Sequence, residues 1–176
     1  MDLWRDIETG PKVPAVINVI VEIPKGSQNK YEYDKKHGVI KLDRVLFSPF
    51  FYPGEYGIIP QTFAEDGDPM DAIVLVTNPT YPGVLIESRP IGMLQMKDGG
   101  EMDDKILCVA KDDIRFENVN DISDLQKHVT KEIGHFFATY KQLEGKKVEV
   151  LGWKNAASAK KAISAGIKLY QKTFKK

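Results

Sequence analysis

Residues 15–23 read Ala-Val-Ile-Asn-Val-Ile-Val-Glu-Ile, and this alternation predicts a β-strand. The side chains of Ala15, Ile17, Val19, Val21 and Ile23 share one face of that strand. Similar short segments, separated by Gly and Pro, follow along the chain and predict further strands. They are residues 30–34, 41–47, 72–77, 84–87, 91–96, 105–110 and 148–151.

Two later segments have helical periodicity instead. Asp121, with Asp124 three positions later, resembles a capping box and predicts a helix over residues 121–143, which Gly145 ends. A last helix is expected from about Asn155. Many short strands combined with helices favour an α+β fold with a closed or strongly twisted sheet.

Composition limits the class of protein. The 176 residues are enough for one domain, expected over 1–176, and 25 basic against 25 acidic residues disfavour a general polyanion binder. The N-terminus lacks a secretory signal, and no apolar run could span a bilayer, so a cytoplasmic protein without membrane contact is expected. The single Cys108 excludes an intramolecular disulfide, and the three histidines lack zinc spacing.

The neutral total hides segregated charge. Asp66-Gly67-Asp68-Pro69-Met70-Asp71 carries three carboxylates without a base, directly before the apolar run 72–76. Like charges this close disfavour joint ionisation, and an oxygen-preferring divalent cation resolves the conflict. The spacing does not fit an EF-hand, and the plainer alternative is a solvated acidic turn.

A second acidic loop, residues 98–104, holds Asp98, Glu101, Asp103 and Asp104. If both loops meet at one mouth, their carboxylates could hold more than one cation, as in enzymes that carry out displacement at phosphorus. Phosphate chemistry also needs cations and hydroxyl donors from the protein. The candidates are Lys30, Arg44, Tyr52, Tyr56, Tyr140 and Lys141, although each alone also fits ordinary surface or core roles.

An ordered set of motifs extends from about residue 13 to 153. It consists of Asp66 to Asp71, which reads Asp-x-Asp-Pro-x-Asp, and of the segments 21–24, 30–32, 43–44, 51–53, 56–57, 89–92, 98–105, 135–141 and 152–153. This set resembles the motifs of soluble family I inorganic pyrophosphatases of the prokaryotic type.

The resemblance implies an OB-like five-stranded twisted β-barrel with flanking α-helices, and Mg²⁺-dependent hydrolysis of pyrophosphate by an inorganic diphosphatase. It implies several Mg²⁺ per site, with Mn²⁺ or Zn²⁺ as substitutes, and a cytoplasmic homohexamer. The implied metal ligands are Asp66, Asp71, Asp98, Asp103 and Glu32, with Asp103 preferred to Asp104 on spacing. Asp68 would activate the water, and Glu22 and Tyr52 would support the site. Lys30, Arg44, Tyr56, Lys105, Tyr140 and Lys141 would hold substrate, and Lys30, Arg44 and Tyr56 would also be catalytic.

Two other classes remain as alternatives. An OB-type nucleic-acid-binding module would use the seven lysines of residues 154–176, although the acidic loops would repel a phosphodiester. A non-catalytic divalent-cation-binding protein would not need the cations in the family's positions. The enzyme interpretation therefore predicts pyrophosphate as partner, and neither nucleic acid nor membrane.

Overall fold

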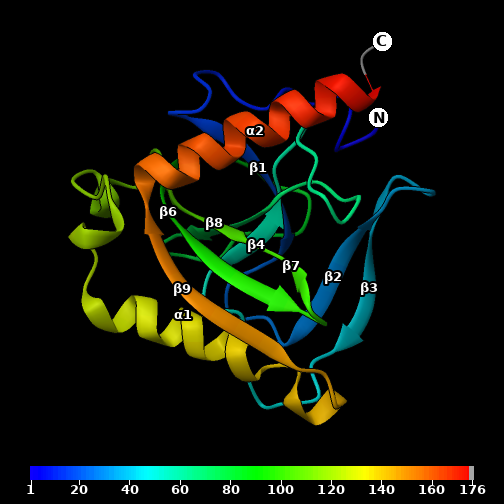
Figure 1. The fold of residues 1–176 in the computed structure, drawn as a ribbon, viewed down its shortest axis with the longest axis vertical. Coiled ribbons are helices and arrows are strands. Elements are labelled where there is room, and N and C mark those ends of the chain that lie inside the picture. Colours follow the sequence, from blue (N-terminus) through cyan, green and yellow to red (C-terminus); the bar gives the residue numbers. More distant parts are fainter. Residues whose placement is uncertain (175–176) are drawn as a thin grey trace.

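The computed structural model describes residues 1–174, and a closed ring of five strands forms its centre (Figure 1). The ring follows the order β1 (Ile17–Ile23), β4 (Glu55–Ile58), β5 (Asp71–Leu75), β8 (Lys105–Ala110) and β6 (Leu85–Asp98), and β6 pairs again with β1. All these pairs are antiparallel except β5 with β8. The predicted five-stranded barrel is thus confirmed.

Four further strands extend this ring or lie beside it. β7 (Glu101–Met102) and β9 (Val148–Asn155) both pair with β6. β2 (Asn29–Asp34) and β3 (Val39–Val45) form a separate two-stranded hairpin, which projects at one side of the barrel in Figure 1. Two predicted strands, 84–87 and 91–96, are one continuous β6, and the short strand β4 was not predicted.

Two α-helices flank the sheet, α1 (Lys127–Thr139) and α2 (Ala156–Phe174). Short 3₁₀ turns precede and follow α1: η1 (Ile114–Phe116), η2 (Ile122–Asp124) and η3 (Gln142–Glu144). The expected single helix over 121–143 is therefore wrong. Asp121 and Asp124 do form a capping box, but it caps η2, and Gly145 ends η3 with a left-handed φ of 69°.

The core lies on both sides of β1, so the alternation that predicted this strand does not divide it into a buried and an exposed face. All seven of its residues are buried. Ile17 and Val19 pack with Ala159 and Ile163 of α2. A strand covered on both faces cannot be told from a half-covered strand by alternation alone.

The lysine-rich tail is mainly a helix face. Lys161, Lys168 and Lys172 of α2 are exposed, as the solvated-face interpretation expects, whereas Lys175 and Lys176 lie outside the described residues. Among residues 1–174, no helix is long and apolar enough to cross a membrane.

Candidate active site

One cavity of about 580 Å³ collects most of the residues that the sequence singled out. Eight carboxylates and four lysines line it, together with several tyrosines. Twelve predicted site residues are among them: Glu22, Lys30, Glu32, Tyr56, Asp66, Asp68, Asp71, Asp98, Asp103, Lys105, Tyr140 and Lys141. Arg44 and Tyr52 do not line the cavity. The two acidic loops therefore meet at one mouth, as their charge pattern suggested.

The acidic turn of residues 66–71 is fixed by its own hydrogen bonds. The Asp68 N–H donates to Asp66 Oδ1 at 3.0 Å, and the Met70 N–H donates to Thr62 Oγ1, also at 3.0 Å. Strand β5 begins at Asp71, so the buried strand holds this carboxylate at the cavity floor while Asp68 stays exposed on the turn.

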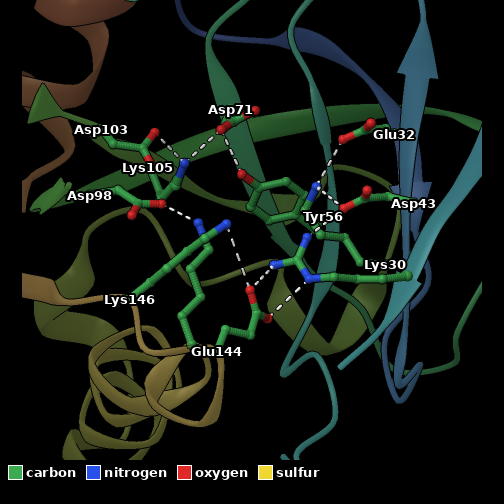
Figure 2. Close-up of polar contacts among 12 residues, drawn as sticks. Lys30, Glu32, Asp43, Tyr56, Asp71, Asp98, Asp103, Lys105, Glu144 and Lys146 are labelled. Atoms are coloured by element: carbon green, nitrogen blue, oxygen red, sulfur yellow. Dashed lines mark hydrogen bonds and ion pairs between the residues drawn. The ribbon is translucent and has the colours of Figure 1, made fainter. Parts of the chain in front are cut away.

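Lys105 lies between two of the carboxylates and is only 2% exposed (Figure 2). Its Nζ donates to Asp71 Oδ2 at 2.6 Å and also to Asp103 Oδ1. Burial by itself lowers the pKa of Lys105, but the charges of Asp71 and Asp103 outweigh this effect and raise that pKa. The ammonium group therefore remains charged inside the protein.

Tyr56 completes this group from strand β4, where its hydroxyl donates to Asp71 Oδ2 at 2.5 Å (Figure 2). Burial raises the pKa of Tyr56, and the charge of Asp71 adds to the increase, so the phenol stays protonated and can donate. Burial and the neighbouring Asp71 likewise raise the pKa of Glu22 to about 8. Glu22 is therefore mainly neutral at pH 7, and it accepts a hydrogen bond of 2.6 Å from the Tyr33 N–H.

The β2–β3 hairpin brings the second set of cations. Lys30 Nζ contacts Glu32 Oε2 at 2.9 Å and Asp43 Oδ2 at 3.1 Å (Figure 2). Arg44, on β3, contacts the same Asp43, and its guanidinium donates to both carboxylate oxygens of Glu144 at 2.9 and 3.0 Å. Arg44 thus lies beside the cavity, in a fork-shaped pairing of the kind that guanidinium groups also make with phosphate.

The end of α1 supplies the opposite wall. Tyr140 is 5% exposed, and Lys141 contacts Asp98 Oδ2. In the second acidic loop, Asp103 faces the cavity, whereas Asp104 Oδ1 accepts a hydrogen bond from the Met96 N–H at 3.3 Å. This placement favours Asp103 over Asp104 as the site residue.

The cavity contains the type of donor atom that a divalent cation prefers. Its carboxylates outnumber its lysines two to one, and every carboxylate offers hard oxygen donors. Burial raises the pKa values of Asp66 and Asp103, and the charge of Asp71 adds to both increases. Within residues 1–174 no three acidic, histidine or cysteine side chains are grouped closely enough to hold an ion. Lysines lie between the carboxylates instead.

Three residues, one in the cavity wall and two beside it, were not predicted as site residues from the sequence. Lys35 contacts Asp68 Oδ1, Asp43 joins Lys30 to Arg44, and Glu144 pairs with Arg44. Of the two acidic residues, Asp43 could have been found from the sequence, because it is adjacent to Arg44. Nothing in the sequence pairs Lys35 with Asp68 or Arg44 with Glu144, residues 33 and 100 positions apart. The histidines lie elsewhere, and His135 packs against Phe50.

Comparison with known proteins gives a consistent result. The family model described as inorganic pyrophosphatase matches residues 19–171. The inorganic pyrophosphatase of Halalkalibacterium halodurans is 58% identical over 150 residues, which are 85% of this chain and 92% of that protein. The one from Haloferax volcanii is 48% identical over 99% of both chains. The crystal structure of inorganic pyrophosphatase from Thermus thermophilus superposes with a TM-score of 0.94 at 46% identity, covering 97% of this chain and 99% of that one.

Proposed function

Because this chain belongs to the inorganic pyrophosphatase family and hydrolyses pyrophosphate to two orthophosphates, we propose that the reaction takes place in the acidic cavity. The observation that carries this proposal is the meeting of both acidic loops with Lys30, Lys105 and Lys141 around one cavity. A binding module without catalysis has no need of this combination, so neither alternative class is favoured.

The enzymes of this family need a divalent metal, and we propose that the preferred ion is Mg²⁺, with Mn²⁺ or Zn²⁺ as substitutes. The residues that would hold several such ions are Asp66, Asp71, Asp98, Asp103 and Glu32. Bound ions of this kind neutralise phosphate charge and lower the pKa of a bound water. Glu22, whose pKa is raised by burial, would support the wall of the cavity.

The lysines and tyrosines would bind and orient the substrate. Pyrophosphate is a strong polyanion, and the ammonium groups of Lys30, Lys105 and Lys141 offer charge-assisted hydrogen bonds to its oxygens. The buried hydroxyls of Tyr56 and Tyr140 stay protonated. Tyr140 can donate to a phosphate oxygen, and Tyr56, whose one proton is donated to Asp71 in this structure, would donate to phosphate only by exchanging that partner. We include Arg44 because phosphate oxygens can replace the Glu144 carboxylate on the same guanidinium fork.

Asp68 would act on the attacking water. This carboxylate lies on the rim of the cavity, within the same turn as Asp66 and Asp71. It would accept one proton as the water oxygen bonds to phosphorus and the bridging P–O bond breaks. The leaving phosphate departs with the bridging oxygen, and the charges of Lys30 and Lys141 stabilise it. Tyr52, buried behind Tyr56 with ring centroids 5.7 Å apart, would support that ring.

The direct test is phosphate release from pyrophosphate with Mg²⁺, with and without excess chelator, for the wild type and for Asp68→Asn. We expect rapid release that the chelator abolishes and that Asp68→Asn strongly reduces. Full activity in excess chelator would refute the metal-dependent reaction. Full activity of Asp68→Asn would refute only the role given to this carboxylate.

Two further properties follow from family resemblance and are also proposals. We infer a homohexamer built from two trimers, located in the cytoplasm. Light scattering on the eluting protein tests the assembly, because a hexamer has six times the 19.8 kDa mass of the chain. A monomeric mass at working concentration would contradict it.

A further inference from the structure

Lys35 is the one lysine of the cavity to which we have given no function. It lies in the turn of residues 35–38, which joins β2 to β3. Its ammonium group contacts Asp68 Oδ1 on one side. On another side it lies over the ring of Trp4, 4.8 Å from the ring centroid, within the range of a cation–π interaction.

Trp4 gives this lysine a fixed surface. The indole is 2% exposed, and its Nε1–H donates at 2.8 Å to the carbonyl of Thr62, four residues before the acidic turn begins at Asp66. The rings of Tyr170 and Phe174 from α2 pack edge-on against it, with centroids 6.0 and 5.3 Å away. The position of the indole is therefore set by the acidic loop and by α2 together.

The N-terminal segment also holds the hairpin. The Tyr33 hydroxyl, on β2, donates to Asp2 Oδ1 at 3.1 Å and accepts from the Leu3 N–H at 3.0 Å. Since β2 and β3 form a sheet of their own, these side-chain contacts help to fix the hairpin relative to the barrel. Residues 2–4 thus bridge the hairpin, which carries Lys30, and the acidic loop, which carries Asp68.

From these contacts we propose that Lys35 is a positioning residue for pyrophosphate hydrolysis, held on Trp4 and in turn holding the Asp68 carboxylate toward the cavity. The inference rests on the proposed role of Asp68. Because Lys35 contacts Oδ1, the oxygen that it leaves to accept the proton from the water is Oδ2. An unheld carboxylate on an exposed turn would sample other rotamers, and fewer of its orientations would suit the reaction.

The energetics separate this role from a structural one. The side chains of Lys35 and Asp68 are 41% and 61% exposed, and a pair this exposed contributes little to folding stability. Loss of the ammonium group should therefore change the rate while the thermal unfolding temperature stays close to that of the wild type. Lys36 provides the matched control, because it is the next residue of the same turn, its side chain is exposed, and its backbone N–H, which the substitution keeps, donates to Asp34 Oδ1.

The test measures kcat and KM for phosphate release with Mg²⁺ in Lys35→Met, Lys35→Arg and Lys36→Met. For Lys35→Met we expect kcat to fall about tenfold with KM changed less than about twofold, since misplacement of a reacting group mainly lowers the rate. Lys35→Arg should restore most of the rate, and Lys36→Met should match the wild type. A raised KM with unchanged kcat would overturn the proposal, because Lys35 would then bind substrate instead.

Two further measurements keep the outcomes distinct. In an Asp68→Asn background, Lys35→Met should cause no further loss, because its effect passes through that carboxylate. A full additional loss there would overturn the positioning role. With Trp153 replaced by Phe, Trp4 is the only tryptophan, and its fluorescence should change in Lys35→Met but not in Lys36→Met. If Asp68→Asn inactivates the enzyme while Lys35→Met is fully active, this inference fails and the proposed function stands.

Discussion

Replacement of the buried Glu22 by Gln should make the protein more resistant to alkaline conditions. Glu22 is 6% exposed, and burial raises its pKa from 4.5 to about 8. Between these two values the folded protein holds a proton at this carboxyl that the unfolded chain has already lost. The free energy of unfolding of the wild type must therefore fall as the pH rises through that window.

The size of the effect follows from the width of the window. Each pH unit inside it costs up to about 1.4 kcal/mol of stability, so the loss from pH 5 to pH 8 is roughly 3 to 4 kcal/mol. Gln cannot titrate, and its amide oxygen can still accept from the Tyr33 N–H. The stability of Glu22→Gln relative to the wild type should therefore increase by about 3 kcal/mol across this range.

The assay is urea unfolding of both proteins at several pH values between 5 and 9, with chelator present so that divalent ions do not compete. Glu149→Gln, a change at an exposed position of β9, controls for the loss of one carboxyl. If the wild type and Glu22→Gln lose stability in parallel as the pH rises, the reasoning from burial is refuted.

Three other substitutions test an ion pair, a hydrogen bond and a steric contact in and next to the site. Lys105→Met should reduce the free energy of unfolding, measured with urea in the presence of chelator, by about 3 kcal/mol, because Asp71 and Asp103 lose a buried partner. Mg²⁺ should restore more of that stability in the variant than it adds to the wild type. Tyr56→Phe should lower kcat for phosphate release about tenfold, through loss of a hydrogen bond to a charged acceptor; an unchanged rate would contradict this. Gly57→Ala should destabilise by about 2 kcal/mol or more in the same urea assay, since its Cβ would lie 2.0 Å from the Ile20 carbonyl oxygen.

The alternation of apolar residues predicted most of the strands, but it did not predict which strands pair with one another. The strand over 105–110 has the predicted bounds, because its apolar run is bounded by polar residues on both sides. The short β4 was missed because Glu55-Tyr56-Gly57-Ile58 is only four residues long and directly follows the turn residues Pro53 and Gly54. It is a strand because β1 and β5 pair with it. The single helix predicted over 121–143 was too long, since a capping box can also begin a 3₁₀ turn.

For the site as well, the sequence identified the residues but not the contacts between them. Three aspartates within six residues, followed by a buried strand, were enough to predict an acidic site at Asp66, Asp68 and Asp71. The lysines could be named as cations but not assigned to partners. Only the tertiary structure brings Lys105 between Asp71 and Asp103.

The sequence alone thus determined the chemistry of this protein: which carboxylates, cations and hydroxyls are present, and the ordered motifs that mark its family. The tertiary structure decided which of these groups meet. It set Arg44 beside the cavity rather than in its wall, and it brought Lys35 to Asp68 through a hairpin and an N-terminal residue far away in the chain. The physical reason is that charge and hydrogen bonding act over a few ångströms in space, and sequence separation carries no information about that distance.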